Sequence, residues 1–163
     1  MFLKRLGILA VLWGLLVFPL SAHMVSFLVI ETGLLPDTEV DEYSTLWEDG
    51  LMRGFFDTGH IVTNSPVLRL EKTPLGEIPA EAQADFAEAS EGGADYFVLA
   101  LLDYFTQDGK SKPRQITVRV FATASRKMIY EHKFPAGNGT DLKDEYARAQ
   151  DASRIVAAQV RQP

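Results

Sequence analysis

The chain has 163 residues, of which 47% are hydrophobic, and it contains no cysteine. A chain of this size accommodates one globular domain once a leader is set aside, and the missing cysteine excludes disulfides, thiolate metal sites, cysteine nucleophiles and the lipid-bearing cysteine of a bacterial lipoprotein. The first 22 residues hold two of the 16 basic residues and none of the 22 acidic ones, which leaves 14 basic against 22 acidic residues, a net charge of −8. We therefore expect no nucleic-acid partner, because a phosphate backbone is bound by a basic face.

Residues 1–22, MFLKRLGILAVLWGLLVFPLSA, have the pattern of a secretory signal. Lys4 and Arg5 form a positive start, an apolar stretch runs to Leu20, and small residues follow. Cleavage before His23 is the preferred interpretation. An uncleaved membrane anchor is the alternative, because the apolar stretch is at the lower limit for crossing a bilayer. Both interpretations place the remaining chain outside the cytoplasm, in the periplasm or anchored to the inner membrane and facing it.

The first predicted elements after the leader are a strand and a helix. Residues 25–32, VSFLVIET, form a short apolar run rich in β-branched residues that ends at Gly33, which predicts a central strand. Asp37-Thr38 offers an N-cap, and apolar residues then recur at spacings of three and four as far as Phe55. This spacing predicts an amphipathic helix over residues 39–57.

A second strand, helix and strand are predicted next. Residues 60–64 form a short strand stopped by Ser65-Pro66, and the VLRLE segment after it either extends that strand or serves as a connection. Pro79 stands in the first turn of the next predicted helix, which ends at Gly92-Gly93. Residues 94–107 are apolar on both alternating faces, which predicts a strand in the middle of the sheet, covered on both sides.

The last predicted elements are a hairpin and a helix. In residues 114–124 apolar residues alternate with a set that includes Phe121, so we expect one face of this strand to be wet. A tight turn leads into residues 127–134, its antiparallel partner. The final helix covers residues 141–160, capped by Thr140.

Together these elements predict an α/β (α+β) fold. A mixed sheet of about four to five strands is combined with three helices, in the order strand, helix, strand, helix, strand, strand, strand, helix. Residues 23–163 form a single domain, preceded by the signal or anchor segment.

The sequence predicts no catalytic residue, no cofactor and no metal site. His23, His60 and His132 do not have metal-ligand spacing. A mature amino terminus at His23 would offer an amine and an imidazole to copper, but the plain interpretation is that His23 only follows the cleavage site. Carboxylates cluster on the first predicted helix, where a solvated face is the ordinary explanation and an acid-base or cation site the alternative. These carboxylates are Asp41, Glu42, Glu48, Asp49 and Asp57.

Aromatic residues are the candidates for a protein interface. Phe55-Phe56 and Tyr104-Phe105 are neighbouring pairs, and a small domain rarely buries both members of such a pair equally, so one of each is a candidate for exposure. Burial under a loop or against the other face of the sheet is the favoured alternative. Exposed aromatic side chains anchor protein interfaces. The interaction candidates are Trp47, Phe56, Tyr104 and Phe105.

The succession of segments resembles a known periplasmic group. It is similar to the α/β domain shared by the amino-terminal part of the Tol-Pal protein TolB, the curli secretion protein CsgG and the penicillin-binding-protein activator LpoB. A strand start of the type Gly-Ala-Asp-Tyr is matched by residues 93–96, and a Lys-x-x-Tyr pattern by Lys127 and Tyr130. The chain departs from the group in having neither the lipid-attachment cysteine of CsgG and LpoB nor the propeller domain of TolB.

The resemblance implies a non-enzymatic adaptor that docks onto envelope proteins. Our functional hypothesis is therefore a non-catalytic exported domain that acts as a protein-protein interaction module, with possible membrane association through residues 1–22. The alternative hypothesis is a small periplasmic enzyme or ligand- or ion-binding protein that uses the clustered carboxylates. The sequence leaves the identity of the partner and the oligomeric state open.

Overall fold

In the computed structural model, the described residues are 22–34, 42–72, 74, 77–107, 110–137 and 141–160. Residues 1–21 of the predicted leader, the predicted Asp37-Thr38 cap and the predicted Thr140 cap lie outside these ranges. Asp141 precedes the last helix and its Oδ1 accepts a hydrogen bond of 2.8 Å from the Lys143 amide, as a capping residue does. No helix in the described ranges is both long enough and apolar enough to cross a membrane.

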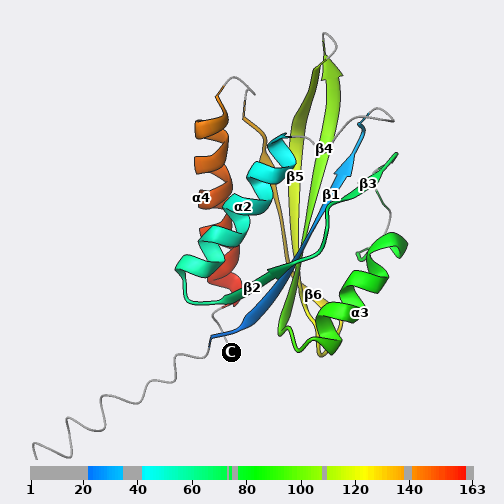
Figure 1. The fold of residues 1–163 in the computed structure, drawn as a ribbon, viewed down its shortest axis with the longest axis vertical. Helices are drawn as coiled ribbons and strands as arrows, with labels where there is room; N and C mark the ends of the chain where they lie inside the picture. The colour runs from blue at the N-terminus through cyan, green and yellow to red at the C-terminus, as the bar shows by residue number, and fades with distance from the viewer. Residues whose placement is uncertain are drawn as a thin grey trace, which may run out of the picture.

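The fold is a six-stranded mixed sheet with helices on both faces (Figure 1). The elements are β1 (Met24–Thr32), α2 (Glu42–Asp57), β2 (Ile61–Asn64), β3 (Leu68–Leu70), a short 3-10 helix (Ala80–Ala82), α3 (Gln83–Glu91), β4 (Tyr96–Gln107), β5 (Lys110–Ala122), β6 (Lys127–Pro135) and α4 (Leu142–Val160). The strand order is β2-β1-β4-β5-β6, and β3 also pairs with β1. The α+β class and the three helices are as predicted, but the sheet has one strand more than the four to five expected.

The additional strand arises where the sequence left the VLRLE segment open. β2 pairs in parallel with the start of β1, ending at Phe27↔Asn64, and β3 pairs with the end of β1, beginning at Ile30↔Leu68. Between these two pairings β1 has two residues, 28–29, whereas the segment that links β2 to β3 has three, 65–67, and includes Pro66. Because proline has no N–H for the ladder, the strand is interrupted at this point and resumes as β3.

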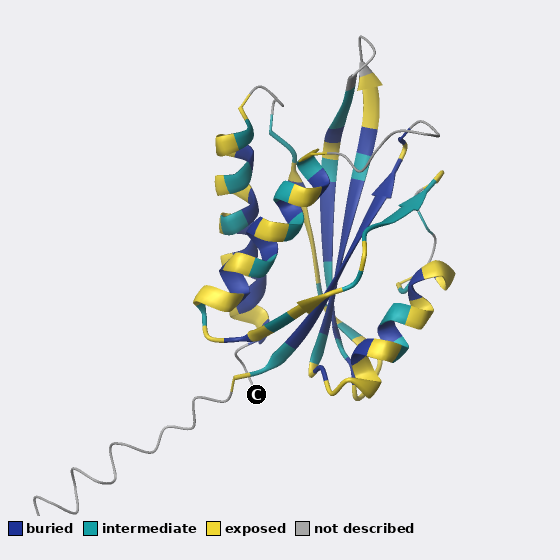
Figure 2. Cartoon of the chain, in the orientation of Figure 1, coloured by how far each residue is buried: buried dark blue, intermediate teal, exposed yellow. Residues whose placement is uncertain are grey.

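β4 is the central strand, as its two apolar faces predicted. Val98, Ala100 and Leu102 pack beneath α2 and α4, on what we call the α2/α4 face. The residues that alternate with them, Phe97, Leu99 and Leu101, pack beneath α3, on what we call the α3 face. Both faces of the central strands are buried (Figure 2), since each carries its own apolar cluster.

One expectation about the hairpin is wrong. The face of β5 predicted to be wet includes Phe121, which is completely buried. Phe121 lies on the α3 face, with its ring centroid 6.2 Å from that of Phe86 in α3. The helix covers this end of the sheet, so an aromatic residue is accommodated where alternation alone predicted solvent.

The two helices of the α2/α4 face cross through small residues. Gly50 and Gly54 of α2 face Ala149 and Ser153 of α4; a Cβ atom added at Gly50 would lie 2.5 Å from the Ala149 Cβ. The Ser153 hydroxyl also donates to the carbonyl oxygen of Leu51. This close approach holds α4 against α2 and fixes both over the sheet.

Candidate protein-binding surface

Two of the four predicted interaction residues belong to the interior. The Trp47 side chain is fully buried, and its Nε1 donates a hydrogen bond of 2.9 Å to Oε1 of Glu145. The buried Tyr104 hydroxyl is 2.7 Å from the Ser44 Oγ. Their polar ends have partners within the fold, so Trp47 and Tyr104 are removed from the candidate surface.

The other two predicted residues are at the surface. Phe56 is 60% exposed, whereas its neighbour Phe55 is buried against Phe27. Phe105 is 36% exposed beside the buried Tyr104. One member of each pair is therefore exposed, the less favoured of the two alternatives. The two exposed rings do not form a single patch, because α2 ends beside β2 whereas β4 ends in the protruding β4-β5 hairpin (Figure 1).

The carboxylates of α2 do not converge on a site. Asp41 lies outside the described residues. Glu48 accepts a hydrogen bond of 2.9 Å from the Asn64 amide of β2, and Asp57 pairs with Arg53 at 3.0 Å. Desolvation, followed by a hydrogen bond to Asp49, raises the pKa of Tyr146 in α4 above 10.0. The cluster is thus divided among contacts with three different parts of the fold.

Two buried carboxylates have structural roles. Glu31 of β1 is fully buried and receives hydrogen bonds of 2.9 and 2.8 Å from the Nε and Nη2 atoms of Arg69 in β3. Glu145 of α4 accepts from Trp47 and, at 2.9 Å, from the Gly137 amide. Buried charges require such partners, and both residues join elements that are distant in the sequence.

Histidine and acid come together at the start of β1. His23 Nδ1 lies 3.5 Å from an Asp95 carboxylate oxygen, which also accepts a hydrogen bond of 2.9 Å from the Met24 amide. The His23 ring stacks at 5.8 Å on that of His60. Among the described residues no group of three or more histidine or acidic side chains is arranged to hold a metal ion.

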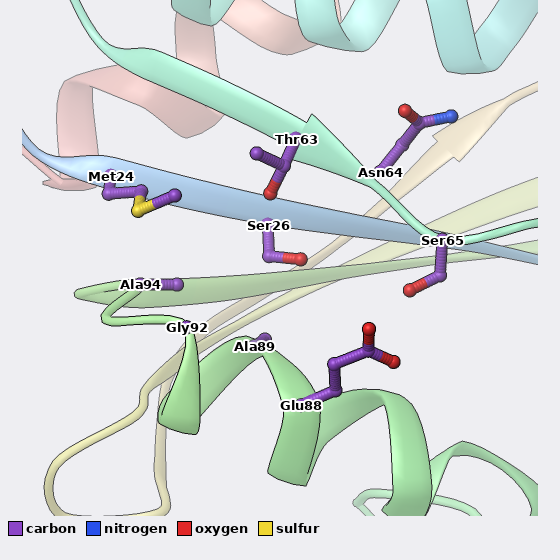
Figure 3. A pocket seen from close by; sticks show the side chains of 9 residues that line it. All are labelled: Met24, Ser26, Thr63, Asn64, Ser65, Glu88, Ala89, Gly92 and Ala94. Atoms are coloured by element: carbon purple, nitrogen blue, oxygen red, sulfur yellow. The ribbon is translucent and has the colours of Figure 1, made fainter.

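A groove of about 200 Å³ lies between α3 and the edge of the sheet at β2. Figure 3 shows the hydroxyl groups of Ser26, Thr63 and Ser65 and the carboxylate of Glu88 directed into the same space. The groove is thus lined by oxygen atoms from β1, from the β2 edge and from α3. Sequence analysis missed it because these residues belong to no motif and meet only when β2 pairs with β1.

Charge is divided unevenly along the sequence. Residues 73–109, which contain α3 and β4, carry eight acidic residues and no basic one. Residues 110–136, which contain β5 and β6, carry seven basic residues and one acidic one. The two segments meet in the folded chain, because Arg126 lies 2.9 Å from Gln83 of α3 and Arg119 donates to the carbonyl oxygen of Glu77.

Several hairpin cations have partners within the molecule. Arg114 pairs with Asp103 at 2.6 Å, and Arg119 pairs with Glu131 at 2.6 Å. The Arg126 guanidinium lies 4.8 Å from the centroid of the Phe86 ring. Lys127 and Lys133 of β6 are exposed, and in the described part of the chain neither forms an ion pair.

The chain belongs to a protein family described as "Uncharacterised protein", whose sequence profile matches residues 35–136. No curated protein matches the chain. Among solved structures, PelC from Paraburkholderia phytofirmans, crystallised as a dodecamer, has 15% identity over 86% of this chain and 90% of its own, with a TM-score of 0.53. This likeness shows the fold.

TolB and LpoB, to which the succession of segments is similar, are also among the matching solved structures. TolB from Acinetobacter baumannii has 11% identity and a TM-score of 0.39, over 86% of this chain and 27% of its own. The LpoB carboxy-terminal domain from Escherichia coli has 10% identity and a TM-score of 0.40, over 71% of this chain and 83% of its own. TolB and LpoB are therefore among the matching structures, at scores too low to add to the fold established by PelC.

Proposed function

We propose that this chain is an exported, non-catalytic domain of the bacterial cell envelope that acts by binding proteins. The observation that carries the proposal is the pair of open sheet edges: in the described part of the chain, β2 and β6 each pair on one side only. Open edges are surfaces at which other protein segments add to a sheet. Phe56 and Phe105 provide exposed aromatic rings near the ends of α2 and β4.

Two further observations support the proposal. Residues 1–22 have the pattern of a secretory signal, which supports export. PelC, which has the same fold, is a dodecamer, and this supports a role in which the domain offers its surface to other protein chains. The buried acids Glu31 and Glu145 act in holding the fold together, so the binding role rests on the surface.

Cross-linking in cells tests the proposal. The full chain, with a carboxy-terminal epitope tag, is expressed in a Gram-negative host that carries its natural neighbours. We expect it in the periplasmic or membrane fraction and expect discrete protein adducts after cross-linking. A cytoplasmic location, or a folded protein that forms no adduct with itself or any other protein, would contradict the proposal.

Matched variants assign the adducts to surfaces. Phe56→Ser changes a residue that is 60% exposed and should lower the free energy of unfolding by less than about 1 kcal/mol. Phe105→Ser, at a residue that is 36% exposed, should cost more, about 1–2 kcal/mol, and leave the protein folded. We expect at least one of the two to lose an adduct. Because the two residues lie on different elements, the variant that loses it identifies the end of the sheet that binds.

A further inference from the structure

The groove beside α3 has unused hydrogen-bonding capacity. Ser26 is only 6% exposed, yet its hydroxyl points into the groove (Figure 3), and in the described part of the chain it has no hydrogen-bond partner. The hydroxyls of Thr63 and Ser65 and the carboxylate of Glu88 face the same space. A lysine ammonium group has three donors and no acceptor, and it is satisfied by this combination of oxygen atoms.

The helix beside the groove is acidic along one flank. Glu88 lines the groove, whereas Gln83, on the other flank, contacts Arg126 of the β5-β6 turn at 2.9 Å. Asp85 is at position i−3 from Glu88 in α3, so it shares its flank. In the part of the chain that the structure describes, neither acid has an ion-pair partner.

The opposite edge carries two exposed lysines that project to opposite faces of the sheet: Lys127 is opposite Ala122 and, through it, Tyr96 of the α2/α4 face. Lys127 and Lys133 lie along β6, about 20 Å apart at about 3.3 Å per residue. Lys133 is opposite Thr117, which is opposite Leu101, a residue of the α3 face. Because opposite residues in a sheet project to the same side, Lys133 also projects to the α3 face. If β6 of a second copy paired with β2 and extended the same sheet, its Lys133 side chain would project toward the groove.

We propose that the chain associates head to tail with further copies of itself, the β6 edge of one copy docking beside β2 and α3 of the next. Lys133 enters the groove and donates to Ser26 and Glu88. β6 runs in the same direction as β2, since it is antiparallel to β5 and β5 is antiparallel to β4. The contact joins the β6 edge of one copy to the β2 edge of the next, so each copy keeps one unused edge at which a further copy can add. This inference rests on the proposed function and specifies its partner.

Sedimentation velocity on the full chain, recovered from the cell envelope, tests the contact. We expect species larger than a monomer at low salt, and a shift toward monomer as salt screens the charges. Reversal of one edge, by Asp85→Lys with Glu88→Lys or by Lys127→Glu with Lys133→Glu, should weaken association by about tenfold or more, because attraction becomes repulsion. Lys143→Glu with Arg154→Glu is the matched control: it changes the net charge by the same amount as the β6 reversal, at exposed positions of α4.

Mixing the two reversed variants is the decisive step. One variant has two basic edges and the other has two acidic edges, so neither should associate alone, whereas an equimolar mixture should form alternating assemblies. A parent protein that is monomeric at low salt, or reversals that leave association unchanged, would overturn the inference. So would a mixture that fails to associate although both variants unfold at the temperature of the parent.

Two other outcomes are distinguishable. If Lys127→Thr with Lys133→Thr increases association, the lysines protect the β6 edge from pairing, and the inference is wrong. If the parent is monomeric but cross-links to a different envelope protein in cells, the proposed function stands and the self-association is overturned.

Discussion

Trp47 and Glu145 are 98 positions apart in the sequence, and the indole Nε1 of the first donates a hydrogen bond of 2.9 Å to the buried carboxylate of the second. Trp47→Phe leaves that carboxylate with one donor fewer and creates a small cavity. We expect the free energy of unfolding to fall by about 2–4 kcal/mol, measured by urea denaturation followed by far-UV circular dichroism. Phe56→Leu, at a 60% exposed position of the same helix, is the control and should change it by less than about 0.5 kcal/mol. A Trp47→Phe protein as stable as the parent would show that the bond contributes nothing to the fold.

The crossing of α2 and α4 should not tolerate a methyl group. A Cβ atom added at Gly54 would lie 2.4 Å from the Cβ of Ser153 and 2.2 Å from its Oγ. Gly54→Ala should therefore destabilise the protein by about 1–3 kcal/mol through overpacking, although alanine favours helix. Thr45→Ala, at an exposed position of α2, isolates the helix propensity and should stabilise slightly. Equal and favourable effects of the two substitutions in thermal unfolding would contradict the close crossing.

Removing one partner of the Glu31–Arg69 ion pair, which joins β1 to β3, should destabilise the fold more than removing both partners. Arg69→Met leaves Glu31 buried without its cation, and we expect a loss of about 3 kcal/mol, at the lower end for buried pairs because Arg69 is partly exposed. The double variant Glu31→Met with Arg69→Met removes both charges and should recover most of this loss. Chemical denaturation of the two single variants and the double variant measures the coupling. A double variant less stable than Arg69→Met would contradict it.

The pKa of Tyr146 is raised above its ordinary value. Desolvation raises its pKa first, and the hydrogen bond to Asp49 raises it further. A raised pKa in the folded state means that the protonated phenol stabilises the fold below pH 10.0, and that this contribution is lost as the pH rises through the folded pKa. Absorbance at alkaline pH, compared between the parent and Tyr146→Phe, reports the step. Asp49→Asn should lower the pKa of Tyr146 only partly; an unchanged titration would contradict the role of Asp49.

The sequence predicted the elements best where hydrophobic pattern and fold agree. β4 is apolar on both faces, and the structure places it in the middle of the sheet. The predictions were wrong or incomplete where burial or pairing depends on an element that is distant in the sequence. Phe121 was expected in solvent because alternation does not show that α3 covers that part of β5. β3 was left undecided because its pairing depends on the end of β1, which lies about 40 residues earlier in the sequence.

The candidate surface was harder to predict than the fold. Phe56 and Phe105 are exposed, whereas Trp47 and Tyr104 are buried. The spacing of three and four places Trp47 on one stripe with Phe55 and so favours its burial, but it does not show that Glu145, 98 positions later in the sequence, accepts the indole hydrogen bond. The groove depends on three separate chain segments, so it is visible only after the strand order is known.

The position of β1 has a consequence for how the chain acquires its structure. All of its partner strands come later in the sequence, and the parallel contact with β4 joins residues about 70 positions apart. The β4-β5-β6 meander, in contrast, is made of neighbours and closes with short loops. Local pairings form before distant ones because shorter loops lose less entropy on closure. When the chain emerges amino end first, from a ribosome or through a membrane, β2 and β3 become available to β1 first, and β1 lacks its central partner β4 until nearly two thirds of the protein has appeared.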